Sequence, residues 1–216
     1  MMKRMFSRAA VQSALVLMAG IFSAQMVSAA DMAPDAMVQK VSGETLAAIK
    51  TDKAILSGDA TRIIALVDSK VMPHVNFERM AGTALGPAWR TATPEQKKRL
   101  ENEFKTLLAR TYAGAFKLAT DKEIKVLPMR DAPTGNDVLV KTLLIGSGEP
   151  VNLDYRLEKT AGKGLGWKAY NLAINNIWMI QNYKQQFANE IKAGGIEGLI
   201  EKLAAQNRNN QSNQNK

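Results

Sequence analysis

An unbroken alternation of apolar and polar side chains runs through residues 151–158, V-N-L-D-Y-R-L-E. A period of two is typical of a β-strand that buries one face and exposes the other. A glycine-rich turn at 162–166 leads into a second run with strand character, which begins at Trp167. Two such runs joined by a loop that contains glycine predict a β-hairpin, so we expect the fold to be built on an antiparallel sheet.

The period changes to that of a helix after this hairpin. Two sets of apolar residues recur three or four positions apart, and the pair Gly194 and Gly195 between them is typical of a helix C-terminus. The sets are Ile180, Tyr183, Phe187 and Ile191, and then Ile196, Leu199, Ile200 and Leu203. We therefore expect two amphipathic helices that cover the sheet.

The segments before the hairpin predict helices first and strands second. Thr93, Pro94 and Gln96 form a start signal for a long helix, because threonine caps, proline fits the first turn and glutamine reaches back to the cap. Helices are predicted at 35–50, 63–72, 77–85 and 94–118, and strands at 123–127 and 137–145. The predicted fold class is α+β, with a curved antiparallel sheet of about four strands wrapped by helices.

The first 30 residues have the form of a secretory signal peptide. Basic residues precede an uncharged, mostly apolar segment at 9–22, and small residues lead to a cleavage site near Ala30. The apolar segment is shorter than the ~20 residues of a membrane-spanning helix. We expect an exported, periplasmic protein whose mature chain folds as one domain at 31–205.

Charge and cysteine content narrow the class of partner. The chain has 29 Lys and Arg against 20 Asp and Glu, and without the signal's basic Lys3, Arg4 and Arg8 the balance is 26 − 20 = +6. Such a charge suits anionic surfaces, but export argues against nucleic acid as a partner. The absence of cysteine predicts no disulfide and no lipid-modified anchor, so we expect a diffusing monomer. Residues 206–216 are polar and are predicted to be a disordered tail.

The sequence offers little that could carry catalysis. His74 is the only histidine, and there is no cysteine, so the usual ligands of zinc and iron are missing. No glycine-rich phosphate loop precedes a helix. We therefore predict no catalytic residue, no metal and no cofactor. Residues 138–145 are apolar on both faces, which favours either a core strand under helices or a strand with one face on an apolar cavity.

Several ordered motifs point to one family. They are D-S-K-V-M-P-H-V at 68–75, F-E-R-M-A-G-T-A-L-G-P-A-W-R-T-A-T-P-E-Q at 77–96, and G-W-K-A-Y-N-L-A-I-N-N-I-W-M-I-Q-N-Y-K-Q-Q-F at 166–187. Together with T-Y at 111–112 they resemble the MlaC family, the periplasmic phospholipid carriers also called Ttg2-type toluene-tolerance proteins. The likeness covers residues 60–203, nearly the whole predicted domain.

The resemblance implies a fold and a task that spacing alone does not give. The fold would be NTF2-like, and its cavity would hold the acyl chains of one glycerophospholipid. The protein would carry this lipid between an outer-membrane lipoprotein–porin complex and an inner-membrane ABC transporter complex with a membrane-anchored lipid-binding subunit. Such transport maintains the lipid asymmetry of the outer membrane.

The resemblance also implies which residues contact the lipid. Trp167 and Tyr170 stand at the family's W-x-x-Y, and Tyr112 stands in its T-Y. The set expected to line the cavity is Trp89, Phe104, Leu108, Tyr112, Val140, Tyr155, Trp167, Tyr170, Leu172 and Ile174. Trp178 stands where many members have a small residue, which suggests a narrower cavity mouth.

Two other classes of function stay open. One is an NTF2-like enzyme acting on an apolar small molecule, which needs an acid or a base inside the cavity. Asp154 alternates with the apolar face of its strand and is expected to point away from that cavity. The other is a periplasmic adaptor without a ligand, whose apolar faces only form a core. Extraction of lipid from the purified protein discriminates between a carrier and an adaptor.

Overall fold

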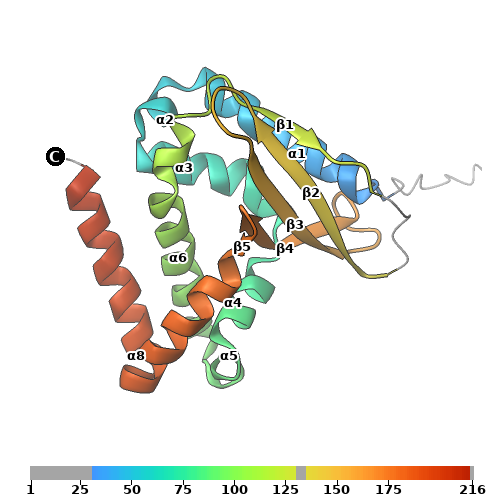
Figure 1. Ribbon diagram of the computed structural model, residues 1–216. Helices are drawn as coiled ribbons and strands as arrows, with labels where there is room; N and C mark the ends of the chain where they lie inside the picture. Colours follow the sequence, from blue (N-terminus) through green and yellow to red (C-terminus); the bar gives the residue numbers. More distant parts are fainter. Residues whose placement is uncertain (1–30, 130–134, 215–216) are drawn as a thin grey trace, which may run out of the picture.

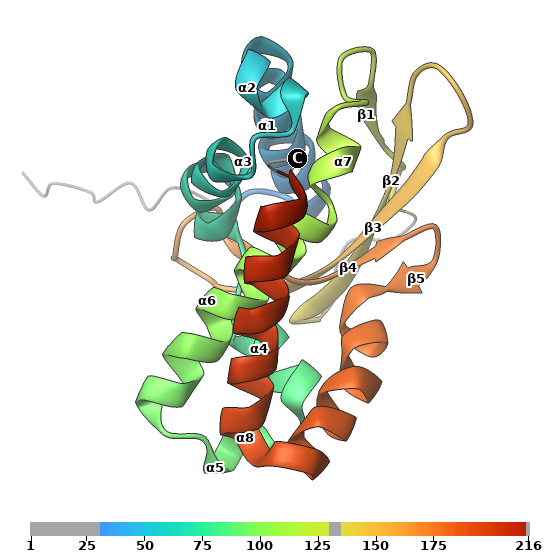
Figure 2. The same ribbon diagram turned by 90° about the vertical axis from the view of Figure 1, so that its left-hand side faces the viewer.

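One antiparallel sheet stands on one side of the molecule and the helices stand on the other (Figures 1 and 2). The computed structural model describes residues 31–129 and 135–214, and the predicted signal peptide lies outside them. The strands follow sequence order across the sheet: β1 (Glu123–Val126), β2 (Asp137–Ile145), β3 (Val151–Lys159), β4 (Trp167–Ile174) and β5 (Ile177–Trp178). The α+β class and the β3–β4 hairpin are confirmed, and the short β5 adds a fifth strand. The NTF2-like form of the sheet stays a prediction.

The helices form a long N-terminal series and one C-terminal element. The series is α1 (Pro34–Thr51), α2 (Lys53–Ser57), α3 (Ala60–Leu66), the π-helix η1 (Val67–Val71), the 3₁₀-helix η2 (Met72–His74), α4 (Phe77–Leu85), α5 (Ala88–Thr91), α6 (Pro94–Thr111) and α7 (Ala113–Phe116). α8 (Met179–Gln214) follows the sheet. No helix in the described ranges combines the length and the hydropathy that a membrane span requires.

Two of the predicted helices are interrupted. The helix expected at 63–72 changes from α to π geometry at Val67 and then to a 3₁₀ turn that contains Pro73, whose ring cannot sit inside a regular helix. The helix expected to reach residue 118 ends at Thr111, because the backbone of Tyr112 turns away at φ −98° and ψ 5°. The predicted start is confirmed, since the Thr93 hydroxyl accepts from the Gln96 N–H and the Gln96 side chain accepts from the Thr93 N–H.

The first core joins α4, α6 and α8. Phe104 of α6 lies at the centre of this core and is 1% exposed. The centroid of its ring is 5.0 Å from the ring centroids of both Tyr183 and Phe187, in edge-on contacts. Such contacts add to the stabilisation that burial of aromatic surface provides. This core fixes the helical side of the molecule away from the sheet (Figure 2).

A second core lies between α1 and the sheet. Met37 and Val38 of α1 pack with Val140 of β2, Leu157 of β3 and Trp167 of β4. Only the inner face of β2 is covered in this way: Val140 is fully buried, whereas the next residue back, at 139, is 42% exposed. The strand that reads as apolar on both faces therefore packs in the core on one face and faces solvent on the other.

α8 bends where the sequence predicts a helix end, and it continues where disorder is predicted. Gly195 interrupts the helical backbone with φ 67° and ψ −167°, a region that only glycine adopts readily. Beyond it, the predicted disordered tail at 206–216 is wrong for the described part, because the helix runs on to Gln214. Asn207 is 5% exposed, and its side-chain amide donates to the Glu103 backbone carbonyl at 2.9 Å. The backbone carbonyl of Asn207 accepts from the Arg110 guanidinium at 2.7 Å. Polar pairing with α6 orders this segment.

Candidate functional site

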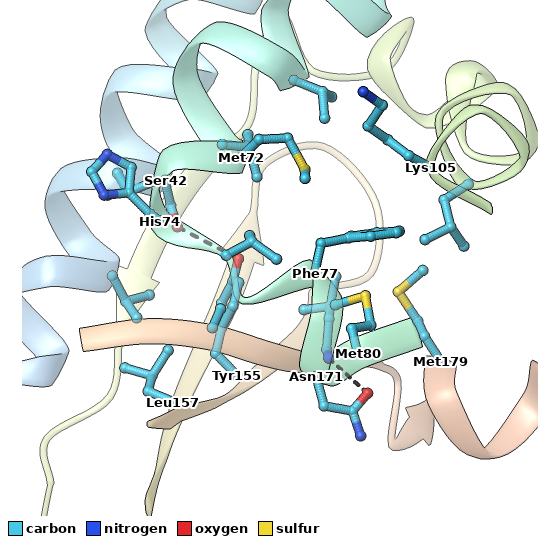
Figure 3. A pocket seen from close by; sticks show the side chains of 18 of the residues that line it. Ser42, Met72, His74, Phe77, Met80, Lys105, Tyr155, Leu157, Asn171 and Met179 are labelled. Carbon is cyan, nitrogen blue, oxygen red and sulfur yellow. Dashed lines mark hydrogen bonds between the residues drawn. The ribbon is translucent and has the colours of Figure 1, made fainter. Parts of the chain in front are cut away.

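A cavity of about 250 Å³ lies between the helices and the inner face of the sheet. α1, η1, η2, α4 and α6 contribute its helical walls, and β3 and β4 contribute its floor (Figure 3). Most lining side chains are valine, methionine, leucine and phenylalanine. A concave, mostly apolar site with a few polar groups is the usual form of a small-molecule pocket.

The helical walls come from residues that read as ordinary apolar stripes in the sequence. α1 contributes Met37, Val38 and Val41, and η1 contributes Val67 and Val71. The η1–η2 segment can line the cavity because residue 75 pairs with Ala169 of β4, and the N–H of Asn76 donates to the Ala169 carbonyl at 2.8 Å. This pairing ties the irregular segment to the sheet beside the cavity.

The polar groups of the cavity are few and mostly paired with one another or with nearby backbone. The Ser42 hydroxyl donates to the Tyr155 hydroxyl at 3.5 Å, and burial raises the pKa of the Tyr155 phenol, which keeps it neutral. Asn171 accepts from the N–H of Ile180 at 3.4 Å and so holds the start of α8 against β4. His74 lines the cavity half-buried, and burial lowers its pKa.

One lining side chain carries a full charge. Lys105 of α6 donates to the Asp68 carboxylate of η1 at 2.8 Å, and the side chains are 22% and 46% exposed. The pair therefore lies where the cavity meets solvent. No aspartate or glutamate is among the described residues that line the cavity, and the described residues contain no group of three or more potential metal ligands.

Four of the ten residues predicted to contact a ligand line this cavity. They are Leu108 and Tyr112 on α6 and at its C-terminus, Tyr155 on β3, and Leu172 on β4. Tyr155 and Leu172 are register partners across the two strands, so their side chains share one face of the sheet. The lipid contact itself stays a prediction for all four.

The structure does not bring the other six to the cavity, and in four cases core packing is the reason. Phe104 is taken up by the aromatic contacts with α8. Val140 and Trp167 are buried between α1 and the sheet, where the Trp167 indole donates to the Met32 carbonyl at 3.0 Å. Trp89 packs at the edge of the first core beside Gly82, with the Lys97 ammonium 5.1 Å from its ring centroid.

Tyr170 and Ile174 miss the cavity because of the sheet's geometry. The register between β3 and β4 shifts at Arg156, so that Tyr170 has no partner opposite it. A bulge of this kind breaks the alternation that places Tyr170 and Leu172 on one face. Ile174 lies at the end of β4, opposite Leu153. The expectation that Trp178 narrows the mouth is wrong as well, since Trp178 is not among the lining residues and lies under the Arg156 guanidinium, 4.6 Å away.

The walls supplied by α1, η1 and η2 are not apparent from the sequence. Val38 and Val41 were visible as an apolar stripe, but a stripe does not say whether it meets a core or a cavity. Nothing in the sequence places the lone His74 in a cavity, yet it lines the cavity at the end of η2. Pro73, directly after the helix predicted at 63–72, was the one available signal that this segment departs from a regular helix.

Comparison with known proteins decides the family. The family profile described as MlaC protein matches residues 39–205. The chain belongs to the MlaC family. Two curated relatives agree: the intermembrane phospholipid transport system binding protein MlaC of Haemophilus influenzae is 20% identical over 176 residues, covering 81% of this chain and 82% of the relative. The toluene tolerance protein ttg2D of Pseudomonas putida is 26% identical over 183 residues, covering 84% and 82%.

A solved structure extends the family match to the fold. The phospholipid-binding protein from Ralstonia solanacearum, determined in complex with a phospholipid, superposes with a TM-score of 0.78 and is 38% identical. The match covers 83% of this chain and 99% of that chain. The resemblance predicted from the motifs is therefore confirmed, and lipid transport and phospholipid binding are the activities for which MlaC-family proteins are named.

Proposed function

We propose that this protein is a periplasmic phospholipid carrier that holds acyl chains in the cavity between α1, α6 and the sheet. The observation that carries the proposal is the composition of the cavity wall, most of whose lining residues are apolar. An apolar wall gains free energy when acyl chains replace water against it. The phospholipid complex of the Ralstonia relative supports the same ligand class.

A carrier is needed because phospholipids leave membranes slowly. A two-chain lipid exposes ~28 methylenes to water, each at a cost of about 0.8 kcal/mol. Desorption is therefore opposed by a barrier on the order of 20 kcal/mol. A protein that lowers this barrier needs an apolar cavity and no catalytic group.

The cavity wall has the means to adapt to chains of different shape. Its volume, about 250 Å³, lies below the ~300–1,000 Å³ of typical ligand pockets. Methionine is flexible and polarizable and fills irregular gaps, and four methionines line the wall: Met37, Met72, Met80 and Met179. We expect these side chains to change rotamer when a lipid enters, so that the cavity widens around the chains.

Membership of the family supports a proposal for the route of transport. We propose that the lipid passes between an outer-membrane lipoprotein–porin complex and an inner-membrane ABC transporter complex with its membrane-anchored lipid-binding subunit. The intermembrane transport system named for the Haemophilus relative supports this route. Leu108, Tyr112, Tyr155 and Leu172 are the proposed acyl contacts among the residues predicted from the sequence.

The cavity argues against an enzyme. General acid–base catalysis needs a titratable group aimed at the ligand and tuned by a partner. Ser42 bonds with Tyr155, and the Glu44 carboxylate, whose charge acts on His74, pairs with Lys40 instead. No carboxylate lines the cavity in the described ranges. These pairings leave His74 without the relay that would make it a base.

The test is to weigh the protein with and without its cargo. The protein is purified from cells and measured by mass spectrometry under native conditions, and lipid is then extracted under denaturing conditions. We expect about one diacyl phospholipid per chain, absent from protein that has been refolded without lipid or detergent and restored by incubation with phospholipid vesicles. Protein that carries no extractable lipid and takes none from vesicles would exclude the carrier and favour the adaptor.

A further inference from the structure

Lys105 is the one lysine, arginine, aspartate or glutamate among the described residues that line the cavity. Its aliphatic stem runs along an apolar wall while its ammonium stays near water, since the side chain is 22% exposed. Long basic side chains commonly divide in this way between apolar surface and solvent. Figure 3 shows Lys105 at the edge of the cavity opposite Tyr155 and Leu157.

The ammonium of Lys105 is held by a carboxylate of η1, a helix that lines the cavity through other residues. Asp68 lies in η1 between Val67 and Val71, both of which line the cavity, and its carboxylate accepts from Lys105 at 2.8 Å. η1 is a π-helix, a form that is rare in proteins overall but is often found at functional sites. Because the Asp68 side chain is 46% exposed, this ion pair contributes little net stability and is open to exchange.

We propose that Lys105 contacts the phosphodiester of the bound lipid and that Asp68 holds its ammonium at the rim when no lipid is present. The inference rests on the proposed function. A lipid whose chains fill the apolar cavity must leave its phosphate at the boundary with water, which is where the ammonium lies. A lysine serves an anionic phosphate as a point charge with three donors. Lys105 therefore favours phospholipids over neutral lipids with the same chains.

The experiment compares two lipids that differ only in the headgroup. Protein is incubated with vesicles that contain equal amounts of dioleoylphosphatidylglycerol and dioleoylglycerol, then separated from them, and the bound lipids are extracted and quantified. Because every variant meets the same vesicles, the ratio of phospholipid to diacylglycerol isolates the contribution of the headgroup. For Lys105→Gln we expect this ratio to fall roughly tenfold, as for the loss of one charge-assisted contact.

Three matched variants guard the interpretation. Lys98→Gln removes the same charge from an exposed position of the same helix and should keep the wild-type ratio. Lys105→Arg keeps the charge, so its ratio of phospholipid to diacylglycerol should stay close to the wild-type value. Asp68→Asn releases the ammonium and should raise the ratio, provided that circular dichroism shows the same fold. A lower ratio in Asp68→Asn would overturn the exchange between the carboxylate and the phosphate.

The remaining outcomes separate the possible sources of phosphate and the two proposals. Inorganic phosphate at 10 mM should leave the wild-type ratio unchanged, since a free anion gains nothing from the cavity. If it lowers the ratio to the Lys105→Gln value, Lys105 is a site for free phosphate and the headgroup contact is refuted. If Lys105→Gln takes up both lipids at the wild-type ratio, the headgroup contact is refuted while the carrier stands. If wild-type protein takes up neither lipid, the carrier itself fails.

Discussion

The Arg79 guanidinium lies 3.5 Å from the centroid of the Tyr170 ring. Arg79 also pairs with Asp137 of β2 at 2.9 Å and with Glu158 of β3 at 2.5 Å. Together with Tyr170 of β4, these contacts join α4 to three strands. Burial, followed by the nearby Asp137 carboxylate, raises the pKa of the Tyr170 phenol. Tyr170, at the bulge in β4, therefore links helix α4 to the sheet and does not line the cavity.

Tyr170→Leu should therefore lower stability and leave lipid uptake unchanged. Loss of a cation–π contact at a partly exposed site costs about 0.5–1 kcal/mol, which urea unfolding can resolve. Tyr170→Phe retains the ring and should keep most of that contribution. Normal stability of Tyr170→Leu combined with lost lipid would return Tyr170 to the binding site.

Leu172→Glu should abolish lipid uptake without unfolding the domain. The side chain lines the cavity opposite Tyr155, and an unpaired carboxylate there is unfavourable and repels acyl chains. Leu139→Glu makes the same change on the solvent face of the sheet, where the leucine is 42% exposed, and should bind lipid normally. Bound lipid is measured by extraction and folding by circular dichroism. Normal uptake by Leu172→Glu would exclude this residue from the site.

His74 should make the protein less stable in mild acid. Burial lowers its pKa below the ordinary value of 6.5, and this outweighs the nearby Glu44. Between the folded pKa and 6.5 the unfolded chain binds more protons, so the stability contributed by neutral His74 is full above pH 6.5 and is lost as the pH falls through the folded pKa. The unfolding free energy of wild type minus that of His74→Gln should decrease as the pH is lowered through this window. The subtraction cancels the contribution of the carboxylates that both proteins share. A difference independent of pH would show that His74 does not titrate in this range.

Gly195 and its neighbour provide a matched pair for the bend in α8. A Cβ at either position meets nothing within 4 Å, so alanine tests backbone conformation alone. Gly195→Ala forces alanine to φ 67° and ψ −167° and should cost about 1–3 kcal/mol. Gly194→Ala lies in helical backbone and should be neutral or stabilising by up to about 1 kcal/mol. Thermal melts should separate the two variants by several degrees, and equal melting temperatures would mean that the bend is not imposed by Gly195.

The C-terminal helix should be needed for full stability. Deleting residues 206–216 removes the bonds of Asn207 with Glu103 and Arg110 and should lower the unfolding free energy by about 1–3 kcal/mol, as expected for the loss of hydrogen bonds that include one to a charged group. Deleting only 212–216 spares those bonds and should have no effect. Equal stability of both truncations with the full chain would restore the predicted disordered tail.

The sequence by itself determined what depends on near neighbours in the chain. The alternation at 151–158, the cap at Thr93 and the glycine at Gly195 each act over a few residues, and each predicts the element or the boundary that the structure contains. The ordered motifs were equally informative about the family, because they are properties of the sequence alone.

Only the tertiary structure decided which apolar faces enclose a cavity and which fill a core. Phe104 and Leu108 lie four residues apart on one face of α6, yet Phe104 meets the aromatic rings of α8 while Leu108 meets the cavity. The one-residue shift at Arg156 likewise separates Tyr170 from Leu172. Removal of apolar surface from water lowers the free energy, whether a neighbouring side chain or a ligand covers that surface. An apolar pattern therefore predicts burial, and the packing of distant segments decides whether a core or a ligand provides it.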